Sequence, residues 1–482
     1  MRQQGIFPYP LTATRRARGS MTLTGLVFGL LFIGIAVSLT GFILTQADRE
    51  RARGQYEAAL RIAEAGIAYY RWRLAHFPND LTDGTGTPGP YEHTYTDPET
   101  GVVGTFSLQI SGQEFCGELS SITITSTGWT AENPQLRRAV RVTLARPTVA
   151  EYSYLLNSNV WAGSDRQIYG PYHTNGGVRM DGTNHSTVTS AQEVWWCTSS
   201  FGCSGSGEWK PGVFGSGPNS HLWQYPVASF DFNNITLDLA SIRDAVQEGG
   251  GIYLTPQGKG FHLVLQSDGS VRISRVQTVN WVWAYDTDTG WHKSFEIIKK
   301  EKFLETRTIP AECPIIYAEG DVWLEGVAAG KVSVIAARPQ NPTKDPTIYL
   351  AGSITYAGNS TTDGLAAVAE GDVLIPLLSP DVMTLRGVFV AQRGWFGRKH
   401  YHPADLSSAY DPYVFRDYLS IQGSVVSNGR VGTKWSCGGS YCSGYNERVN
   451  AYDRQLAIHP PPLVPTVREE TALIEWREVA PP

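Results

Sequence analysis

The sequence is poor in charged residues, and one long stretch has none. Aspartate, glutamate, lysine and arginine make up 18% of its 482 residues, below the roughly 25% of an average soluble domain. No charge interrupts Met21–Thr45, and no proline lies between Thr12 and Phe77. At about 1.5 Å per residue, an uncharged helix of that length crosses a bilayer. The low charge, with 50 glycines, 14 tryptophans and 23 tyrosines, argues against a helical cytosolic enzyme and favours a large β-rich, extracytoplasmic body.

Motifs of several enzyme and ligand-binding classes are also missing. The sequence has no Gly-x-Ser-x-Gly elbow and no phosphate-binding glycine loop. His400 and His402 lie beside Arg398 and Lys399, in a segment expected to be an exposed loop without metal-ligand spacing. The formal net charge of −5 gives no general attraction for nucleic acid. We therefore expect no metal, no cofactor and no nucleic-acid partner.

The six cysteines indicate an oxidising compartment. Cys197 and Cys203 flank one short loop rich in glycine and serine, and Cys437 and Cys442 flank another. We predict that a disulfide closes each loop. Zinc is the alternative, but neither pair has the two-residue knuckle spacing. Two further cysteines remain, and the sequence leaves open whether they pair: Cys116 and Cys313.

The N-terminal region predicts one continuous helix over residues 20–77. Its first part, 20–45, is apolar and suits lipid, whereas 46–77 carries apolar residues at three-and-four spacing and suits packing against a soluble domain. The stripe that would be covered includes Ile67, Tyr70 and Leu74. Arginines before the apolar run place the start of the chain in the cytoplasm and the rest outside.

The leader and helix together resemble a type IV prepilin. A short basic segment ends at Gly19, Ser20 follows, and the apolar helix runs on without a break. The resemblance implies cleavage by prepilin peptidase between Gly19 and Ser20, with the helix retained in the membrane. An ordinary secretory signal has a shorter core and a different cleavage site. A plain membrane anchor remains an alternative.

Two details refine the resemblance. Thr24 stands at the fifth position after the cut, where major pilins have a glutamate that pairs with the N-terminus of the adjacent subunit. Residues 63–66, Ala-Glu-Ala-Gly, are similar to a signature of PilX-type minor pilins. The resemblance implies a minor pilin that assembles through its helix with other pilin subunits. Thr24 suits a subunit at the tip, in a pilus or in the pseudopilus of a type II secretion system.

Alternating apolar and polar residues predict a small antiparallel sheet after the helix, with strands at 104–110, 121–126 and 139–145. Farther along, we predict a helix within 235–248 and strands at 260–265, 270–274 and 280–284. Trp281 and Trp283 share a face of the last strand, and we predict that they pack in a core rather than form a sugar-stacking surface. Residues 466–479 predict a short amphipathic helix.

An internal repeat gives the fold of the C-terminal part. The segment 318–322, Ala-Glu-Gly-Asp-Val, returns at 369–373, and looser glycine-containing copies lie at 351–354, 386–389 and 422–425. Short strands between glycine-bearing turns suit a β-solenoid, with a β-sandwich as the alternative. The predicted fold is therefore α+β. The expected units are a leader 1–19, a helix 20–77, a pilin-like sheet 78–148, a β-rich insertion 149–310, a solenoid-like domain 311–462 and a C-terminal tail 463–482.

Paired carboxylates on neighbouring coils of a solenoid could hydrolyse a glycosidic bond. The candidates are Glu319, Asp321, Glu325, Glu370 and Asp372. We interpret the Gly-Asp pairs as turn residues that hydrogen-bond their own backbone, and we expect the chain not to be an enzyme. A membrane-tethered, polysaccharide-active enzyme and a type II pseudopilin remain the alternatives to a pilus subunit with roles in assembly and adhesion. The expected location is the cytoplasmic membrane and then the pilus surface, with an unidentified surface or glycan ligand.

Overall fold

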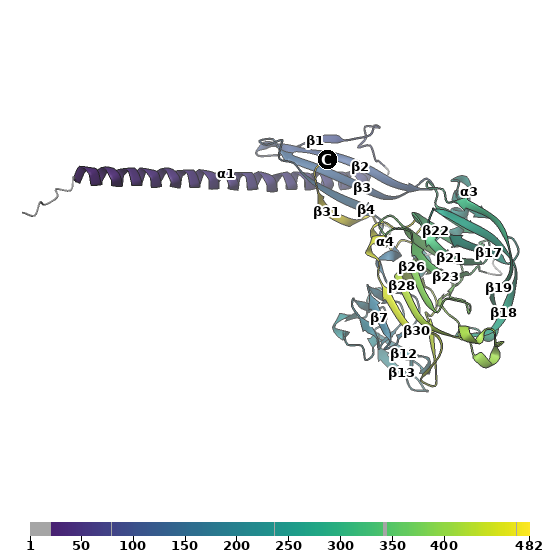
Figure 1. The fold of residues 1–482 in the computed structure, drawn as a ribbon. Helices are drawn as coiled ribbons and strands as arrows, with labels where there is room; N and C mark the ends of the chain where they lie inside the picture. Colours follow the sequence, from purple (N-terminus) through teal and green to yellow (C-terminus); the bar gives the residue numbers. More distant parts are fainter. Residues whose placement is uncertain (1–20, 79, 236, 341–344, 469) are drawn as a thin grey trace, which may run out of the picture.

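The computed structural model describes residues 21–78, 80–235, 237–340, 345–468 and 470–482. Within them, one helix precedes a body made mainly of strands, so the α+β prediction is confirmed at that level. Figure 1 shows the helix α1 extending from the rest of the molecule, with a small sheet over its C-terminal part and the larger body beyond it.

The N-terminal helix is continuous. α1 (Met21–His76) has 56 residues, and its buried residues all lie in the second half, between Ala59 and Leu74. The predicted stripe of Ile67, Tyr70 and Leu74 is buried there. No proline breaks the hydrogen-bond ladder, and the apolar stripe has a sheet to pack on, so the helix continues well beyond the uncharged run.

The sheet that covers α1 has five antiparallel strands. Leu108, Ile124 and Val142 point from it toward the helix and share one buried cluster with Ile62 and Tyr70. In spatial order its strands are β1 (Tyr91–Asp97), β2 (Gly101–Phe115), β3 (Glu118–Thr130), β4 (Arg138–Ala145) and β31 (Ala472–Val479).

The prediction of a C-terminal helix is wrong, because residues 472–479 form strand β31. This strand pairs antiparallel with β4 along Ala472–Val479. Arg138 of β4 donates to both carboxylate oxygens of Glu478, at 2.7 and 2.6 Å. Without β31, the backbone of β4 would be a free sheet edge. Pairing with this distant edge outweighs the local helical pattern.

The body contains two long ladders of parallel strands. The first consists of β16 (Ile252–Leu254), β20 (Ile315–Ala318), β22 (Lys331–Ala336), β24 (Gly364–Ala369), β26 (Val382–Ala391), β28 (Phe415–Ser427), β5 (Tyr154–Leu156), β8 (Tyr172–Thr174), β11 (Val188–Ser190) and β15 (Trp223–Gln224). The second consists of β17 (Gly260–Leu265), β21 (Val322–Ala328), β23 (Ile348–Tyr356), β26, β28, β30 (Ser440–Ala451), β7 (Arg166–Tyr169) and β10 (Thr183–Asn184). Their parallel pairing does not fit a β-sandwich, whose sheets are antiparallel.

Shorter ladders and hairpins complete the body. The parallel ones are β23 with β25 (Val373–Leu374) and β27 (Phe396–Gly397), and β6 (Val160–Ala162) with β9 (Val178–Met180) and β14 (Val213–Phe214). The hairpins are β17 with β18 (Ser270–Asp286), β18 with β19 (Gly290–Thr308), β12 (Val194–Cys197) with β13 (Glu208–Pro211), and β29 (Lys434–Cys437) with β30. The short helices are α2 (Phe232–Ile235), α3 (Leu239–Glu248) and α4 (Arg454–Ile458), and the 3₁₀ turns are η1 (Val149–Glu151), η2 (Ser199–Phe201), η3 (Ser220–Leu222), η4 (Pro403–Asp405) and η5 (Asp411–Tyr413).

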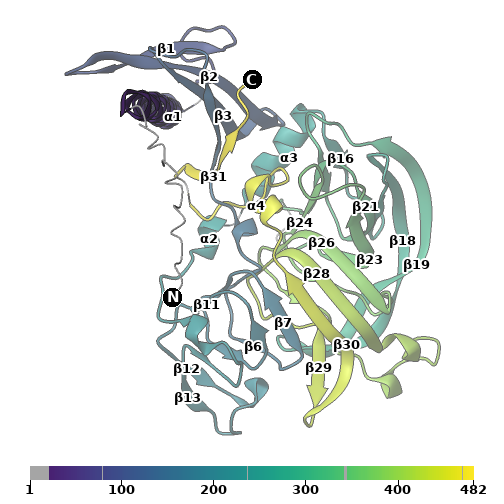
Figure 2. The ribbon, with the colours of Figure 1, turned by 60° about the vertical axis from the view of Figure 1, so that its left-hand side comes forward.

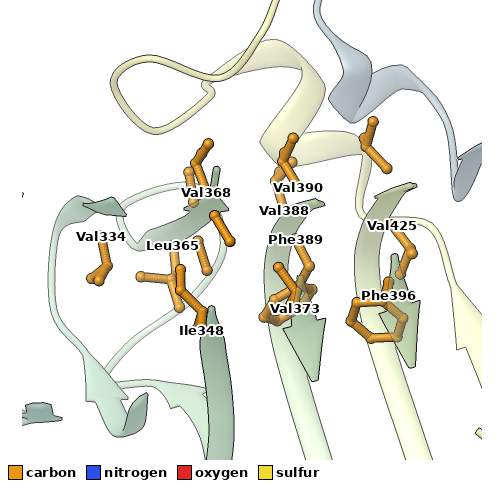
Figure 3. Packing of buried hydrophobic residues seen from close by; sticks show 14 of the residues in the cluster. Val334, Ile348, Leu365, Val368, Val373, Val388, Phe389, Val390, Phe396 and Val425 are labelled. Atoms are coloured by element: carbon orange, nitrogen blue, oxygen red, sulfur yellow. The ribbon is translucent and has the colours of Figure 1, made fainter. Parts of the chain in front are cut away.

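The sequence repeat occupies equivalent places on the ladders. Ala318 pairs with Ala336, Ala336 with Ala369, and Ala369 with Ala391. Figure 3 shows Val334, Phe389 and Val425 on the same ladder, close to Val373 and Phe396 of the shorter one. Strands such as β24 are buried at every residue, because α4 and the residues after it cover the outer face, where Leu456 lies against Gly364. Their sequences therefore read as continuous apolar runs.

Candidate functional site

The first half of α1 is a bare apolar surface. Residues 21–54 are all exposed, and the helix contains a stretch long and apolar enough to cross a membrane. Ser38, Thr40 and Thr45 donate their hydroxyls to carbonyls one turn back, each at 2.8 Å. The helix thus satisfies these polar groups internally, as an apolar medium requires. A surface of this kind needs lipid or other helices around it.

Three residues named from the sequence belong to the N-terminal end. Thr24 lies on the bare part of α1 and is exposed. Gly19 and Ser20 lie outside the residues that the structure describes. The predicted cut between them therefore stays a prediction.

At some positions the second half of α1 packs so closely on the sheet that only a small residue fits. A Cβ on Gly66 would lie 2.3 Å from Ser126 Oγ and 2.8 Å from the ring of Phe106. Ala59 and Ala63 are fully buried, whereas Glu64 is exposed. The Ala-Glu-Ala-Gly segment therefore places its small residues toward the sheet and its carboxylate toward solvent.

All six cysteines form disulfides in the structure. The two predicted loops are closed, Cys197 to Cys203 and Cys437 to Cys442. Cys116 pairs with Cys313 across a sequence separation of 197. This third bond joins the end of β2 to the start of β20 and so ties the sheet to the body.

Most of the segment around His400 is not the exposed loop that we predicted, although His402 at its end is exposed. Arg398 and Tyr401 are fully buried, and His400 is 7% exposed. His400 Nε2 lies 3.9 Å from Cys437 Sγ, so this histidine and two cysteines are close together. Both sulfurs are in the disulfide, however, and a disulfide offers no thiolate to a metal. We predicted an exposed loop because the segment is rich in charged and polar residues, but it is a largely buried connection that follows β27.

Each of the five candidate carboxylates has a protein partner. Asp321 accepts from the Thr347 N–H at 3.1 Å, and Asp372 accepts from the Trp395 N–H at 2.9 Å. Both hydrogen bonds join an aspartate to the next strand level of the ladder, whereas we predicted bonds to the backbone of the aspartate's own turn. The other partners are Tyr253 for Glu319, His262 for Glu325, and Arg338 N–H and Arg393 for Glu370. These contacts support a role in holding successive levels together.

His262 lies between two carboxylates and makes stability depend on pH. Its ring nitrogens are 2.8 Å from Glu301 and 3.1 Å from Glu325. Burial lowers the pKa of His262, but the hydrogen bonds to Glu325 and Glu301 outweigh burial and raise that pKa above 6.5. The stabilisation is therefore complete below about pH 6.5 and is lost as pH rises through the folded-state pKa.

We expect His262→Gln to flatten this part of the pH profile. The parent protein should lose unfolding free energy between pH 5.5 and pH 8.5, and the variant should lose less, since glutamine carries no titrating proton. Urea unfolding of the detergent-solubilised chain at both values measures the difference. His221→Gln, at an exposed histidine, is the control. Equal pH dependence in parent and His262→Gln would contradict the prediction.

The prediction that Trp281 and Trp283 pack in a core is wrong. Their side chains are 43% and 37% exposed, whereas the intervening Val282 is 3% exposed. Lys293 lies 4.3 Å from the Trp281 ring centroid. The alternation of inward and outward side chains was predicted correctly, but the two faces were assigned the wrong way round. The smaller Val282 and Ala284 point inward and pack in a buried cluster with Leu377 and Tyr401.

Comparisons with known proteins find distant likeness among solved structures alone. No family model matches the sequence, and no curated protein matches it. Among solved structures, the competence-associated pilin ComZ from Thermus thermophilus aligns with 88% of this chain and 97% of its own, at 13% identity and a TM-score of 0.27. An alignment with this TM-score assigns no residue of this chain to a position in that pilin.

Proposed function

We propose that the chain is a minor-pilin-like subunit of a type IV pilus that assembles through α1 and displays its body at the filament tip. The observation that carries the proposal is the division of α1 into a bare apolar half and a half docked under an antiparallel sheet. Such a helix can pass from lipid to a filament core without exposing its apolar surface to water.

The body is proposed to be a β-solenoid that serves display and adhesion rather than catalysis. Parallel ladders over successive strand levels support a solenoid. The partners found for the five carboxylates support structural roles for these residues. Thr24 supports the tip position, because a subunit without a glutamate there does not pair with the N-terminus of a subunit above it.

The proposed path begins in the cytoplasmic membrane, with the body outside. Prepilin peptidase cuts between Gly19 and Ser20, and α1 then joins the helices of other pilin subunits in the filament. The Cys116–Cys313 bond supports this path, because it holds the body to the sheet when force acts on the filament.

The processing prediction can be tested by mass. In cells with prepilin peptidase, sheared filaments should contain a chain that begins at Ser20, and immunogold labelling of the body should mark filament ends. Cells without the peptidase should retain residues 1–19 and keep the chain in the membrane. Gly19→Val should reproduce that result in peptidase-positive cells, because the cut follows a glycine. A chain that keeps its leader in both strains would contradict the proposal.

A further inference from the structure

A cavity of about 320 Å³ opens where distant segments of the body meet. Its wall comes from the β6–β7 region, the turn η2, the end of β18, and the segment around β29 and β30. Figure 2 shows β6, β7, β29 and β30 in the same part of the body. The volume falls in the range of small-ligand pockets. The sequence did not single out its residues, because no local motif contains more than a few of them.

The cavity is lined by more cations than anions. Arg166, Arg430, Lys434 and Arg448 line it, together with two carboxylates, Asp165 and Asp286. Arg448 and Lys434 both approach Asp165, at 2.7 and 3.7 Å. That carboxylate is therefore shared between two cations, and the lining keeps an excess of positive charge.

Arg166 is a buried cation whose hydrogen-bond partners are neutral, although the nearby Asp165 carboxylate also attracts it. It is 7% exposed, and its Nη2 donates to Tyr154 Oη and to Asn450 Oδ1, both at 2.7 Å. Its Nε has no hydrogen-bond partner among the described residues. Burying a guanidinium with only neutral hydrogen-bond partners costs free energy. An anionic ligand in the cavity would offset that cost.

The positive field of Arg166 also acts on its neighbour. Burial, and then repulsion from Arg166, lowers the pKa of Arg448 to about 10. Bringing a negative charge into the cavity relieves this repulsion.

Indole rings supply apolar surface beside these charges. Trp161 lines the cavity and is 39% exposed. Trp435 also lines it and fixes its ring by donating Nε1–H to Arg398 O at 2.8 Å. Aromatic faces next to hydroxyls such as those of Ser199 and Thr287 suit a sugar ring, which has apolar C–H faces and polar edges.

One wall of the cavity is fixed before any ligand arrives. The Cys197–Cys203 disulfide closes the loop that carries η2. Arg430 donates Nη2–H to Ser200 O at 2.8 Å and places its guanidinium 4.3 Å from the Phe201 ring centroid. A wall that is already ordered loses little entropy on binding.

We propose that this cavity binds a carboxylate-bearing sugar of an acidic glycan, with the carboxylate near Arg166 and the ring against Trp161 and Trp435. The proposal names the ligand class for the display role and rests on that proposed function. A nucleic acid fits less well, because it needs a track of cations along its backbone, whereas this site is compact and the chain has a net charge of −5.

The test uses the full chain in detergent micelles and three probes. Tri-galacturonate is the acidic probe, its methyl ester is the matched neutral probe, and a 12-nucleotide single-stranded DNA is the polyanion. By isothermal titration calorimetry, the acid trimer should bind at least tenfold more tightly than its ester and than the DNA. Tighter binding of the DNA, equal binding of acid and ester, or no binding of the acid would each overturn the proposal.

Variants locate the binding. Arg166→Gln and Trp161→Ala should each weaken binding of the acid trimer at least tenfold. Trp161→Ala keeps the test valid if the buried Arg166 variant does not fold, because the Trp161 ring is partly exposed. The matched control is Trp281→Ala, which removes an indole of similar exposure, 43%, outside the cavity and should leave affinity unchanged. Normal binding by Trp161→Ala would overturn the proposal. Binding is measured on the purified chain, so its outcome is independent of whether the chain reaches filaments.

Discussion

Replacing Gly128 with alanine is expected to lower the free energy of unfolding by about 3 kcal/mol, the upper part of the usual range for overpacking. Gly128 lies in β3, opposite α1. A Cβ there would lie 2.4 Å from Ala59 O and 2.4 Å from Ala63 N. Both atoms belong to the helix backbone, which cannot rotate away as a side chain would. β3 cannot retreat either, because β2 and β4 pair with it on both sides.

The helix and the sheet should therefore separate in the Gly128→Ala variant. Hydrogen exchange of the detergent-solubilised chain measures this directly, because amides in residues 59–74 should lose protection while those of the body keep it. Urea unfolding gives the free-energy difference.

Gly54→Ala is the matched control for Gly128→Ala. Gly54 lies on α1, where a Cβ would meet no atom within 4 Å. Alanine should raise helix stability there by up to about 1 kcal/mol, because it has the higher helix propensity. Unchanged protection of residues 59–74 in Gly128→Ala would show that the close approach is not needed for docking.

The elements that could be predicted from the sequence are those whose signal is local. The absence of charge and proline sufficed for α1, and alternation located β2, β3 and β4, though not β1. The missed strand β31 pairs with β4, which lies more than 300 positions earlier in the sequence. The alternation of apolar and polar residues expected of a strand is weak in β31, because most of its residues are exposed or only partly buried.

The order of strands in the first ladder could not be predicted either. Residues 425–427 of β28 pair with 154–156 of β5, so strands from opposite ends of the body's sequence lie side by side. β5, the first strand of the body in the sequence, therefore lies in the middle of the ladder, between β28 and β8. The repeat predicts that similar strands stack, but it says nothing of such a junction.

The site residues divide in the same way. The two short cysteine loops were predictable, since the paired cysteines are only six and five positions apart in the sequence. The Cys116–Cys313 pair and the cavity around Arg166 depend on contacts between distant segments. Arg166 itself looks like an ordinary strand residue until Tyr154 and Asn450 are placed beside it.

Replacing Glu296 with glutamine is expected to lower the free energy of unfolding by about 3 kcal/mol, the cost of leaving buried donors unpaired. Glu296 is 2% exposed and lies on β19. Its Oε1 accepts from Leu377 N–H and from Tyr401 O–H, both at 2.6 Å, and its Oε2 accepts from Ser294 O–H at 2.6 Å. Glutamine has one side-chain oxygen, which can replace only one of the two carboxylate oxygens as an acceptor. Its amide nitrogen would point N–H groups at the donors that the other oxygen now accepts from.

The loss should appear as detachment of the β18–β19 hairpin from the rest of the body, because Glu296 belongs to the hairpin whereas Leu377 and Tyr401 lie outside it. Hydrogen exchange in residues 290–300 measures it. Glu305→Gln, on the same strand, is the control, since Glu305 is 45% exposed and, among the residues that the structure describes, forms an ion pair with Arg307 alone. An exposed pair of this kind contributes at most about 1 kcal/mol.

A double-mutant cycle separates the role of the carboxylate from the volume of the side chain. Tyr401→Phe removes one donor to Glu296 and leaves the ring in place. If the hydrogen bond carries the effect, the double variant should be more stable than the sum of the single losses implies, because each single variant leaves one buried group unpaired. Strict additivity would mean that Glu296 and Tyr401 stabilise the hairpin independently, and the network explanation would then be wrong.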